Sequence, residues 1–375
     1  MFACACWDGY VRIYQLEEPS QNRNASFQNQ QAKLTLTEAH KIFFEQPVLC
    51  FEWSSGPGIG MPQFLFVNLL NGDTVIVQVS DWSHKVFYNF SHPAVDIFFI
   101  SAQGQDFILH ISMHNTIHII NANFSDQQNC GKVIAQVELS GSISAVDYKE
   151  GVLAICYSQP NTQISTTSSS NWKHKIAFGR LNEFLDNKKT YCDIDNPLST
   201  TGMSIRLSSD IQSLIIGSVD GRITRMSVTK PNPSTRMIER GSFELQSQLL
   251  FKAHREESES FGNNPTQPTQ STGGILYPVG LVDWCYHHNH KNIFVSGGGN
   301  GKFIFWDAVK KSKNIEYVCP GPITSGKMSP CGRYLAYGIG DDWSRGVHGM
   351  ANHYSGLRIF VHTMSEPLDY VSKEN

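Results

Sequence analysis

Short runs of β-branched and aromatic residues alternate with polar residues along most of the chain. An alternation of period two places successive side chains on opposite faces of a strand, and stretches with helical spacing are almost absent. Gly, Asn, Asp and Pro separate the runs, which is typical of tight turns between strands. The pattern predicts an all-β chain.

Several runs form pairs around a turn, namely FACACWDGYVRIYQL, FLFVNLLNGDTVIVQV, FILHISMHNTIHIIN, SLIIGSVDGRITRMSV and NIFVSGGGNGKFIFWD. A two-residue hairpin loop that follows the strand twist needs positive φ, which Gly and Asn tolerate best. Asp8-Gly9, Asn71-Gly72, Asp220-Gly221 and Asn300-Gly301 are therefore expected to be equivalent points of a repeat.

The spacing of the turns indicates a WD40-like repeat. From Gly72 to the turn near Asn115 the distance is about one repeat of roughly 40 to 45 residues, and one pair ends in the dipeptide Trp306-Asp307 that names this repeat. Repeated hairpins of this kind predict a seven-bladed WD40 β-propeller. We expect one domain over residues 1–375, with solvated polar loop inserts near 19–31, 158–171 and 256–274.

Composition narrows the class of protein. The 375 residues are 40% hydrophobic and 17% charged, which suits a packed globular domain. A net charge of −3 argues against a protein that coats nucleic acid. Nine cysteines without a repeating spacing favour reduced thiols, with Cys4 and Cys6 as core thiols. No run reaches eighteen apolar residues, so we expect a soluble chain without membrane insertion.

One segment departs from the weakly acidic average. From Arg222 to Arg255 there are seven basic and two acidic residues, a local excess of five positive charges. Such charges can be solvated groups on strand faces that contribute only to solubility. They can equally form a site for carboxylates, because the planar guanidinium of arginine pairs with a carboxylate through two hydrogen bonds.

From Gly217 to about Met364 the sequence resembles the messenger-RNA export factors of the Rae-one/Gle-two type, with the Bub-three checkpoint protein as the nearest alternative. The resemblance rests on ordered motifs: GSVDGR, Pro231-Asn232-Pro233, Phe251-Lys252-Ala253-His254-Arg255, Tyr277-Pro278-Val279, GKFIFWD and Asp342-Trp343-Ser344-Arg345-Gly346. The last motif favours the export type. Family members have an innermost strand in blade one that this sequence lacks, so the first blade is expected to be incomplete at the N-terminus.

The resemblance implies a non-enzymatic adaptor. Family members bind an acidic peptide called the GLEBS segment, carried by a Phe-Gly nucleoporin or by checkpoint kinases, and the resemblance assigns Arg222, Lys252 and Arg255 to that peptide. It also implies a side groove where single-stranded RNA stacks, formed here by Trp284, Lys302, Trp343 and Arg345. For Trp284, on an apolar strand, packing between blades is the alternative.

The sequence offers little for catalysis. The glycine-rich GGGNG stretch before Lys302 is followed by a strand rather than a helix, so it does not predict a phosphate site. The cluster Trp284 to His290 lacks the paired spacings of zinc ligands, and we expect no metal and no cofactor. The export adaptor, localised to the nucleus and the nuclear pore, is the leading hypothesis. A Bub-three-like checkpoint scaffold and an unrelated WD40 scaffold such as a ubiquitin-ligase substrate receptor are the alternatives.

Overall fold

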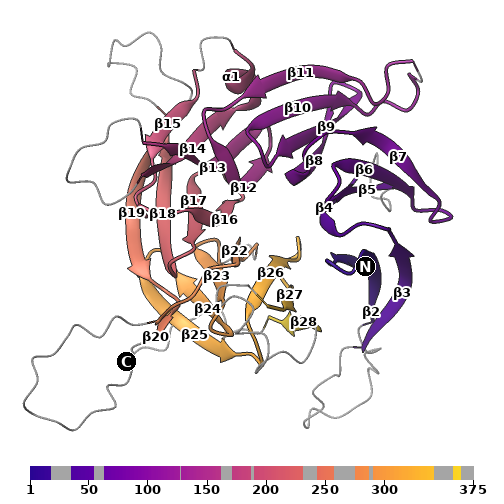
Figure 1. Ribbon diagram of the computed structural model, residues 1–375. Helices are drawn as coiled ribbons and strands as arrows, with labels where there is room; N and C mark the ends of the chain where they lie inside the picture. Colours follow the sequence, from indigo (N-terminus) through magenta and orange to yellow (C-terminus); the bar gives the residue numbers. More distant parts are fainter. Residues whose placement is uncertain are drawn as a thin grey trace, which may run out of the picture. The chain divides into compact units, whose positions relative to one another are not determined.

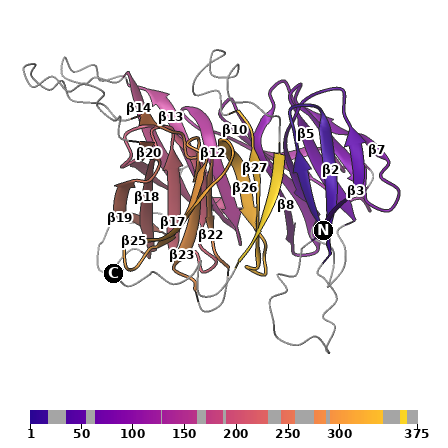
Figure 2. The same cartoon turned by 90° about the horizontal axis from the view of Figure 1, so that it is seen from below.

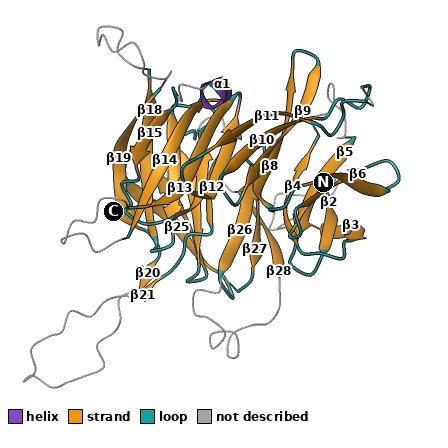
Figure 3. Ribbon diagram, turned by 45° about the horizontal axis from the view of Figure 1, so that its top comes forward, coloured by secondary structure: helices purple, strands orange, loops and turns teal. Residues whose placement is uncertain are grey.

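Strands make up almost all the regular structure of the computed structural model (Figure 3). The structure describes residues 1–17, 35–54, 63–126, 128–161, 171–186, 190–230, 243–256, 275–286, 290–341 and 358–364. Within these ranges there is one helix, α1 (Leu181–Leu185), beside strands β1 to β28. No helix among the described residues has the length and apolar character needed to cross a bilayer. The all-β prediction is confirmed.

The chain divides into two compact units, and the first spans Met1–Leu139. It contains three antiparallel sheets. The first sheet is β1 (Phe2–Ala5), β2 (Tyr10–Glu17) and β3 (Thr35–Phe43). The second is β4 (Val48–Trp53), β5 (Phe64–Leu69), β6 (Asp73–Gln78) and β7 (His84–Asn89). The third is β8 (Ala94–Ala102), β9 (Gln105–Ser112), β10 (Thr116–Asn121) and β11 (Val133–Glu138).

The second unit, Ser140–Asn375, contains four such sheets and a two-stranded ribbon. The first sheet of this unit is β12 (Ser142–Lys149), β13 (Val152–Pro160), β14 (Trp172–Arg180) and β15 (Cys192–Asp195), and the second is β16 (Gly202–Leu207), β17 (Ser213–Ser218), β18 (Arg222–Thr229) and β19 (Glu244–Lys252). The ribbon is β20 (Arg255–Glu256) and β21 (Ile275–Leu276). The third sheet is β22 (Leu281–Trp284), β23 (Ile293–Gly298), β24 (Lys302–Asp307) and β25 (Ser312–Val318), and the fourth is β26 (Ile323–Met328), β27 (Tyr334–Ile339) and β28 (Arg358–Thr363). In this unit β12, β16, β22 and β26 are the inner strands, and β19 and β25 lie outermost (Figure 1).

All five hairpins expected from the sequence form, but their turns are longer than two residues. The N–H of Gly221 donates to the carbonyl of Ser218, three residues earlier, and Gly9, Gly72 and Gly301 repeat this contact. Only the glycine of each Asp-Gly or Asn-Gly pair has positive φ, +76° at Gly221. A left-handed glycine that closes such a turn produces a bulged hairpin. The equivalence of the four turns is confirmed, and the expected loop length was wrong.

Burial follows the strand order within each sheet. The middle strands β17 and β23 are buried along their whole length, whereas the outer strand β19 has several exposed positions. Apolar side chains from neighbouring sheets interlock, as where Ile215 and Ile223 pack with Val282 and Phe294. Each such side chain, fully buried, contributes roughly 1.5–3 kcal/mol. This packing explains the near-continuous apolar runs at the middle strands, which alternate less than a half-exposed strand does.

Most of the segments expected to be polar inserts near 158–171 and 256–274 lie outside the described residues, while residues 158–160 belong to β13 and residue 256 belongs to β20. The insert near 19–31 lies outside the described residues. The first sheet has three strands, and β1 corresponds to the second strand of the four-stranded sheets, because the Gly9 turn follows it.

Candidate peptide-binding site

Two of the three cationic residues predicted to bind a peptide lie opposite each other at one end of a sheet, and the third lies in the ribbon that follows. Arg222 begins β18 immediately after the Gly221 turn, and Lys252 ends β19 directly opposite it as its Cα partner. Arg255 follows three residues later in β20, where it pairs with Leu276. Figure 2 shows β18, β19 and β20 in a side view. We refer to Arg222, Lys252 and Arg255 as the cationic cluster.

The members of the cationic cluster differ in their partners. The Arg222 Nε lies 2.8 Å from Oδ2 of Asp220, and about a third of the Arg222 side chain is exposed. Asp220 is itself fixed by hydroxyl groups, since Ser218 and Thr200 both donate to its Oδ1. Lys252 is exposed. The Arg255 Nε is buried and has no hydrogen-bond acceptor among the described residues.

Arg225 and Lys230, the other basic residues of this stretch that the structure describes, do not join the cationic cluster. Arg225 donates through Nε and Nη2 to the Ser213 hydroxyl at 3.3 and 3.0 Å, and through Nη1 to the Ala308 carbonyl at 3.2 Å. Burial lowers the pKa of Arg225. Lys230 follows the far end of β18, and Arg236 and Arg240 lie outside the described residues. The positive charges counted along the sequence therefore do not all lie together. Arg225 instead bonds Ser213 to the backbone at Ala308 within the unit.

A buried hydrogen-bond network holds the segment between Lys252 and Arg255. His254 Nε2 lies 2.8 Å from the Ser296 hydroxyl, which also accepts from Trp306 Nε1 at 2.8 Å. His254 Nδ1 lies 2.9 Å from Oδ1 of Asn300. Burial lowers the pKa of His254 to about 4, so the ring is neutral at physiological pH and one nitrogen donates while the other accepts. Arg255 thus follows a rigidly held residue.

The role of His254 could not be predicted from the sequence. Its partners Ser296 and Asn300 are 42 and 46 residues away, so no local spacing connects them. The resemblance motifs around His254 and Trp306 contained both residues without indicating that they meet. The backbone fixes the same segment, because the N–H groups of Ala253 and His254 both donate to the carbonyl of Gly221.

Of the four residues expected in the RNA groove, the structure describes Trp284 and Lys302. Trp284 is only 3% exposed, packs against Phe294, and donates from Nε1 to the Arg206 carbonyl at 3.3 Å. Its ring faces are therefore not available to a base, and the packing alternative describes it better. Lys302 forms an ion pair of 3.1 Å with Glu316. Trp343 and Arg345 lie outside the described residues.

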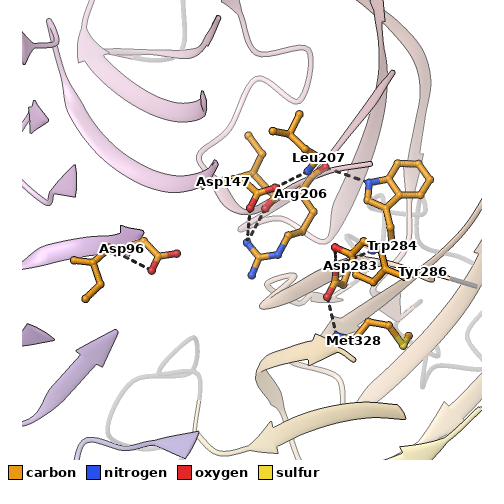
Figure 4. A network of polar contacts seen from close by, with 10 residues as sticks. Asp96, Asp147, Arg206, Leu207, Asp283, Trp284, Tyr286 and Met328 are labelled. Atoms are coloured by element: carbon orange, nitrogen blue, oxygen red, sulfur yellow. Dashed lines mark hydrogen bonds and ion pairs between the residues drawn. The ribbon is translucent and has the colours of Figure 1, made fainter. Parts of the chain in front are cut away.

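A second polar network lies on the inner strands of the second unit (Figure 4). Asp147 on β12 accepts the backbone N–H of Leu207 on β16 at 2.7 Å, and Asp283 on β22 accepts that of Met328 on β26 at 2.7 Å. Arg206 lies 3.7 Å from the Asp147 carboxylate. Burial raises the pKa of Asp147, and Arg206 offsets part of that effect. These carboxylates bond neighbouring sheets together, so the network is structural.

Comparison with known proteins supports the resemblance seen in the motifs. No family model matches the sequence. The chain is 21% identical over 378 residues to the mRNA export factor rae-1 of Caenorhabditis elegans, covering 98% of this chain and 83% of that protein. It is 28% identical to the mRNA export factor GLE2 of Chaetomium thermophilum over 46% of the chain, but spans only 42% of that protein. It is also 28% identical to Protein Rae1 of Drosophila melanogaster, over 41% of this chain and 37% of that protein.

Solved structures test the fold independently of sequence identity. The β-propeller domain of Cps50 (Swd1) from Myceliophteria thermophila aligns with a TM-score of 0.54 at 10% identity, covering 89% of this chain and 88% of that one. The structure of U3-55K aligns with a TM-score of 0.54 at 12% identity, covering 90% and 84%. The predicted seven-bladed β-propeller is confirmed, with three sheets in the first unit and four in the second. The chain is a distant homologue of the Rae1/Gle2 mRNA export factors.

Proposed function

We propose that this protein is a non-enzymatic adaptor that binds an extended acidic peptide, of the GLEBS kind, on a nucleoporin. In this role it links messenger ribonucleoprotein to the nuclear pore, and it works in the nucleus and at the nuclear rim. The observation that carries the proposal is that Arg222 and Lys252 are Cα partners at one end of the β18–β19 hairpin, with Arg255 three residues after Lys252. Homology to proteins named mRNA export factors supports the transport role.

The chemistry of the cationic cluster suits carboxylates. Arg222 already holds one carboxylate, that of Asp220, through Nε, which fixes the guanidinium in a defined orientation. A glutamate that pairs with the partly exposed Arg222 or the exposed Lys252 gains a charge-assisted hydrogen bond. An extended peptide that carries several glutamates can satisfy the three cations together.

The test is a binding titration with a nucleoporin GLEBS peptide and the double variant R222Q/R255Q. Each charge-assisted hydrogen bond contributes roughly 1.5–3 kcal/mol, so the double variant should bind at least about 100-fold more weakly. The matched control is K85Q/R358Q, which removes two exposed positive charges from β7 and β28 and has the same net charge. Equal losses in both variants would show non-specific attraction. Unchanged binding by R222Q/R255Q would show that the site lies elsewhere.

The same assay separates the remaining adaptor hypotheses. A checkpoint-kinase GLEBS peptide that binds more tightly than the nucleoporin peptide, together with kinetochore foci of the tagged protein, would support the checkpoint scaffold. A nuclear-rim signal supports the export adaptor. Failure to bind either peptide would favour the unrelated WD40 scaffold. Direct contact with RNA has no support from Trp284, whose ring is buried.

A further inference from the structure

Two cysteine thiols lie next to each other at the start of the first unit. Cys4 is in β1 and Cys6 follows its end, so both side chains are on one face of the strand. Their sulfur atoms are 4.0 Å apart. Cys6 is only 5% exposed, and its backbone is fixed: its N–H donates to the Tyr10 carbonyl, and its carbonyl accepts from Gly9 N–H.

A fixed cation accompanies the thiols. Arg12 on β2 is the Cα partner of Cys4, and its guanidinium pairs with both carboxylate oxygens of Asp8. The Arg12 guanidinium, paired with Asp8, also lies near the Cys6 thiol.

The distance between the two sulfur atoms indicates whether the pair is better suited to a disulfide or to a metal ion. A disulfide needs a distance of about 2.05 Å, so the sulfurs would have to approach by about 2 Å in a hairpin whose backbone is held on both sides. A bridging metal ion needs a smaller movement. Two metal–sulfur bonds of about 2.3 Å place the sulfurs about 4.6 Å apart when the ion lies in line between them, as a two-coordinate ion prefers. The observed separation of 4.0 Å is closer to that spacing than to a disulfide.

The number and kind of donor atoms limit which metal ion can bind. Zinc in structural sites takes four ligands, and within the described ranges no three His, Cys, Asp or Glu side chains gather closely enough to hold a metal. Thiolates select soft ions, and copper(I) is the soft ion that accepts two of them. Two thiolates and one monovalent ion leave a net charge of −1, which the neighbouring Arg12 complements.

We propose that Cys4 and Cys6 form a two-thiolate binding site for a soft monovalent metal ion of the copper(I) class. Binding breaks two S–H bonds and forms two metal–sulfur bonds, both protons pass to solvent, and no electron is transferred. The site lies in the first unit, whereas the cationic cluster lies in the second, so it is independent of the proposed peptide binding.

The test is anaerobic titration of the reduced full chain with copper(I) against a chromogenic chelator. We expect one ion per chain, and loss of binding in both C4A and C6S. Loss of an outer-shell partner typically costs 10- to 100-fold, so loss of a direct ligand should exceed about 100-fold. R12Q should weaken binding about tenfold. C331A, which removes an exposed thiol of the second unit, should bind as the wild type does.

Unfolding curves of C4A and C6S establish that each variant is folded, and sulfur X-ray absorption of the copper-loaded chain reports the ligands directly. Equal binding by wild type, C4A and C6S would overturn the proposal. The proposal would equally fail if thiol counting in air showed that Cys4 and Cys6 are lost together as a disulfide.

Discussion

Oδ2 of Asp147 accepts the backbone N–H of Leu207 at 2.7 Å, so a side chain of one sheet completes the hydrogen bonding of the next. In D147A this buried N–H loses its acceptor, which should lower the free energy of unfolding by about 1–3 kcal/mol. D147N retains an acceptor oxygen and should lose less. Urea denaturation monitored by tryptophan fluorescence measures both. E45A, at an exposed position, is the control and should stay within about 0.5 kcal/mol of the wild type.

Gly221 and Gly104 provide a test of close backbone approach. Both have φ near +75°, so alanine at either position incurs a similar left-handed strain of about 1–2 kcal/mol. A Cβ at Gly221 would collide with the His254 carbonyl, whereas a Cβ at Gly104 would meet nothing within 4 Å. G221A should therefore destabilise the protein clearly more than G104A does in thermal unfolding. Equal losses would mean that the His254 segment moves aside without cost.

Stability should fall in acid because of two buried histidines. Burial lowers the pKa of His110 to about 3 and that of His254 to about 4. Both pKa values lie below the unfolded value of about 6.5, so protons bind preferentially to the unfolded chain. The free energy of unfolding is then unaffected above pH 6.5 and decreases as pH falls towards 4, by at most about 1.4 kcal/mol per pH unit for each histidine.

His110 offers the sharper variant for this pH dependence. It is fully buried, neither ring nitrogen has a hydrogen-bond partner among the described residues, and Phe90 packs against it. H110F should flatten the decrease in stability between pH 6.5 and 4 without losing a hydrogen bond. Denaturant titrations at pH 7, 6, 5 and 4 measure the slope. A slope in H110F as steep as in the wild type would assign the acid sensitivity to His254 or to carboxylates instead.

The network around His254 should affect peptide binding through position and not through charge. S296A removes the hydroxyl that joins His254 to Trp306, and it should cost about 1–3 kcal/mol of stability. Because Arg255 follows His254, peptide affinity should also fall, although no cation is lost. Titrations at low and high salt separate the two effects, since S296A should keep the wild-type salt dependence while R255Q reduces it.

Local chemistry explains which parts of the fold could be predicted from sequence. The hairpins were predictable because a left-handed glycine is required at Gly72 and Gly301, and their flanking strands alternate in polarity. The inner strand β16 is hard to predict from sequence because Gly202 and Arg206 interrupt its apolar pattern. A charged residue on an inner strand is explained only by a partner in the next sheet, here Asp147.

The candidate site was predictable only in part, because its contacts also depend on residues far away in the sequence. Arg222, Lys252 and Arg255 could be assigned from the motifs that carry the resemblance, but the sequence could not show that Arg225 points to Ser213 and Ala308. Trp284 was ambiguous because an aromatic residue on an apolar strand has the same local sequence whether it packs or binds. Its burial depends on Phe294, which belongs to the neighbouring strand β23.

The carboxylate bonds from Asp147 and Asp283 have a consequence for how the second unit opens. Each bond joins a carboxylate of one sheet to the backbone of the following sheet. Neither sheet of such a pair can open without breaking a bond that holds the other. The amide protons of Leu207 and Met328 should therefore exchange with solvent only in the slowest openings of this unit. If a peptide bound at the cationic cluster applies force to this unit, we expect the bonded sheets to separate in pairs and not one at a time.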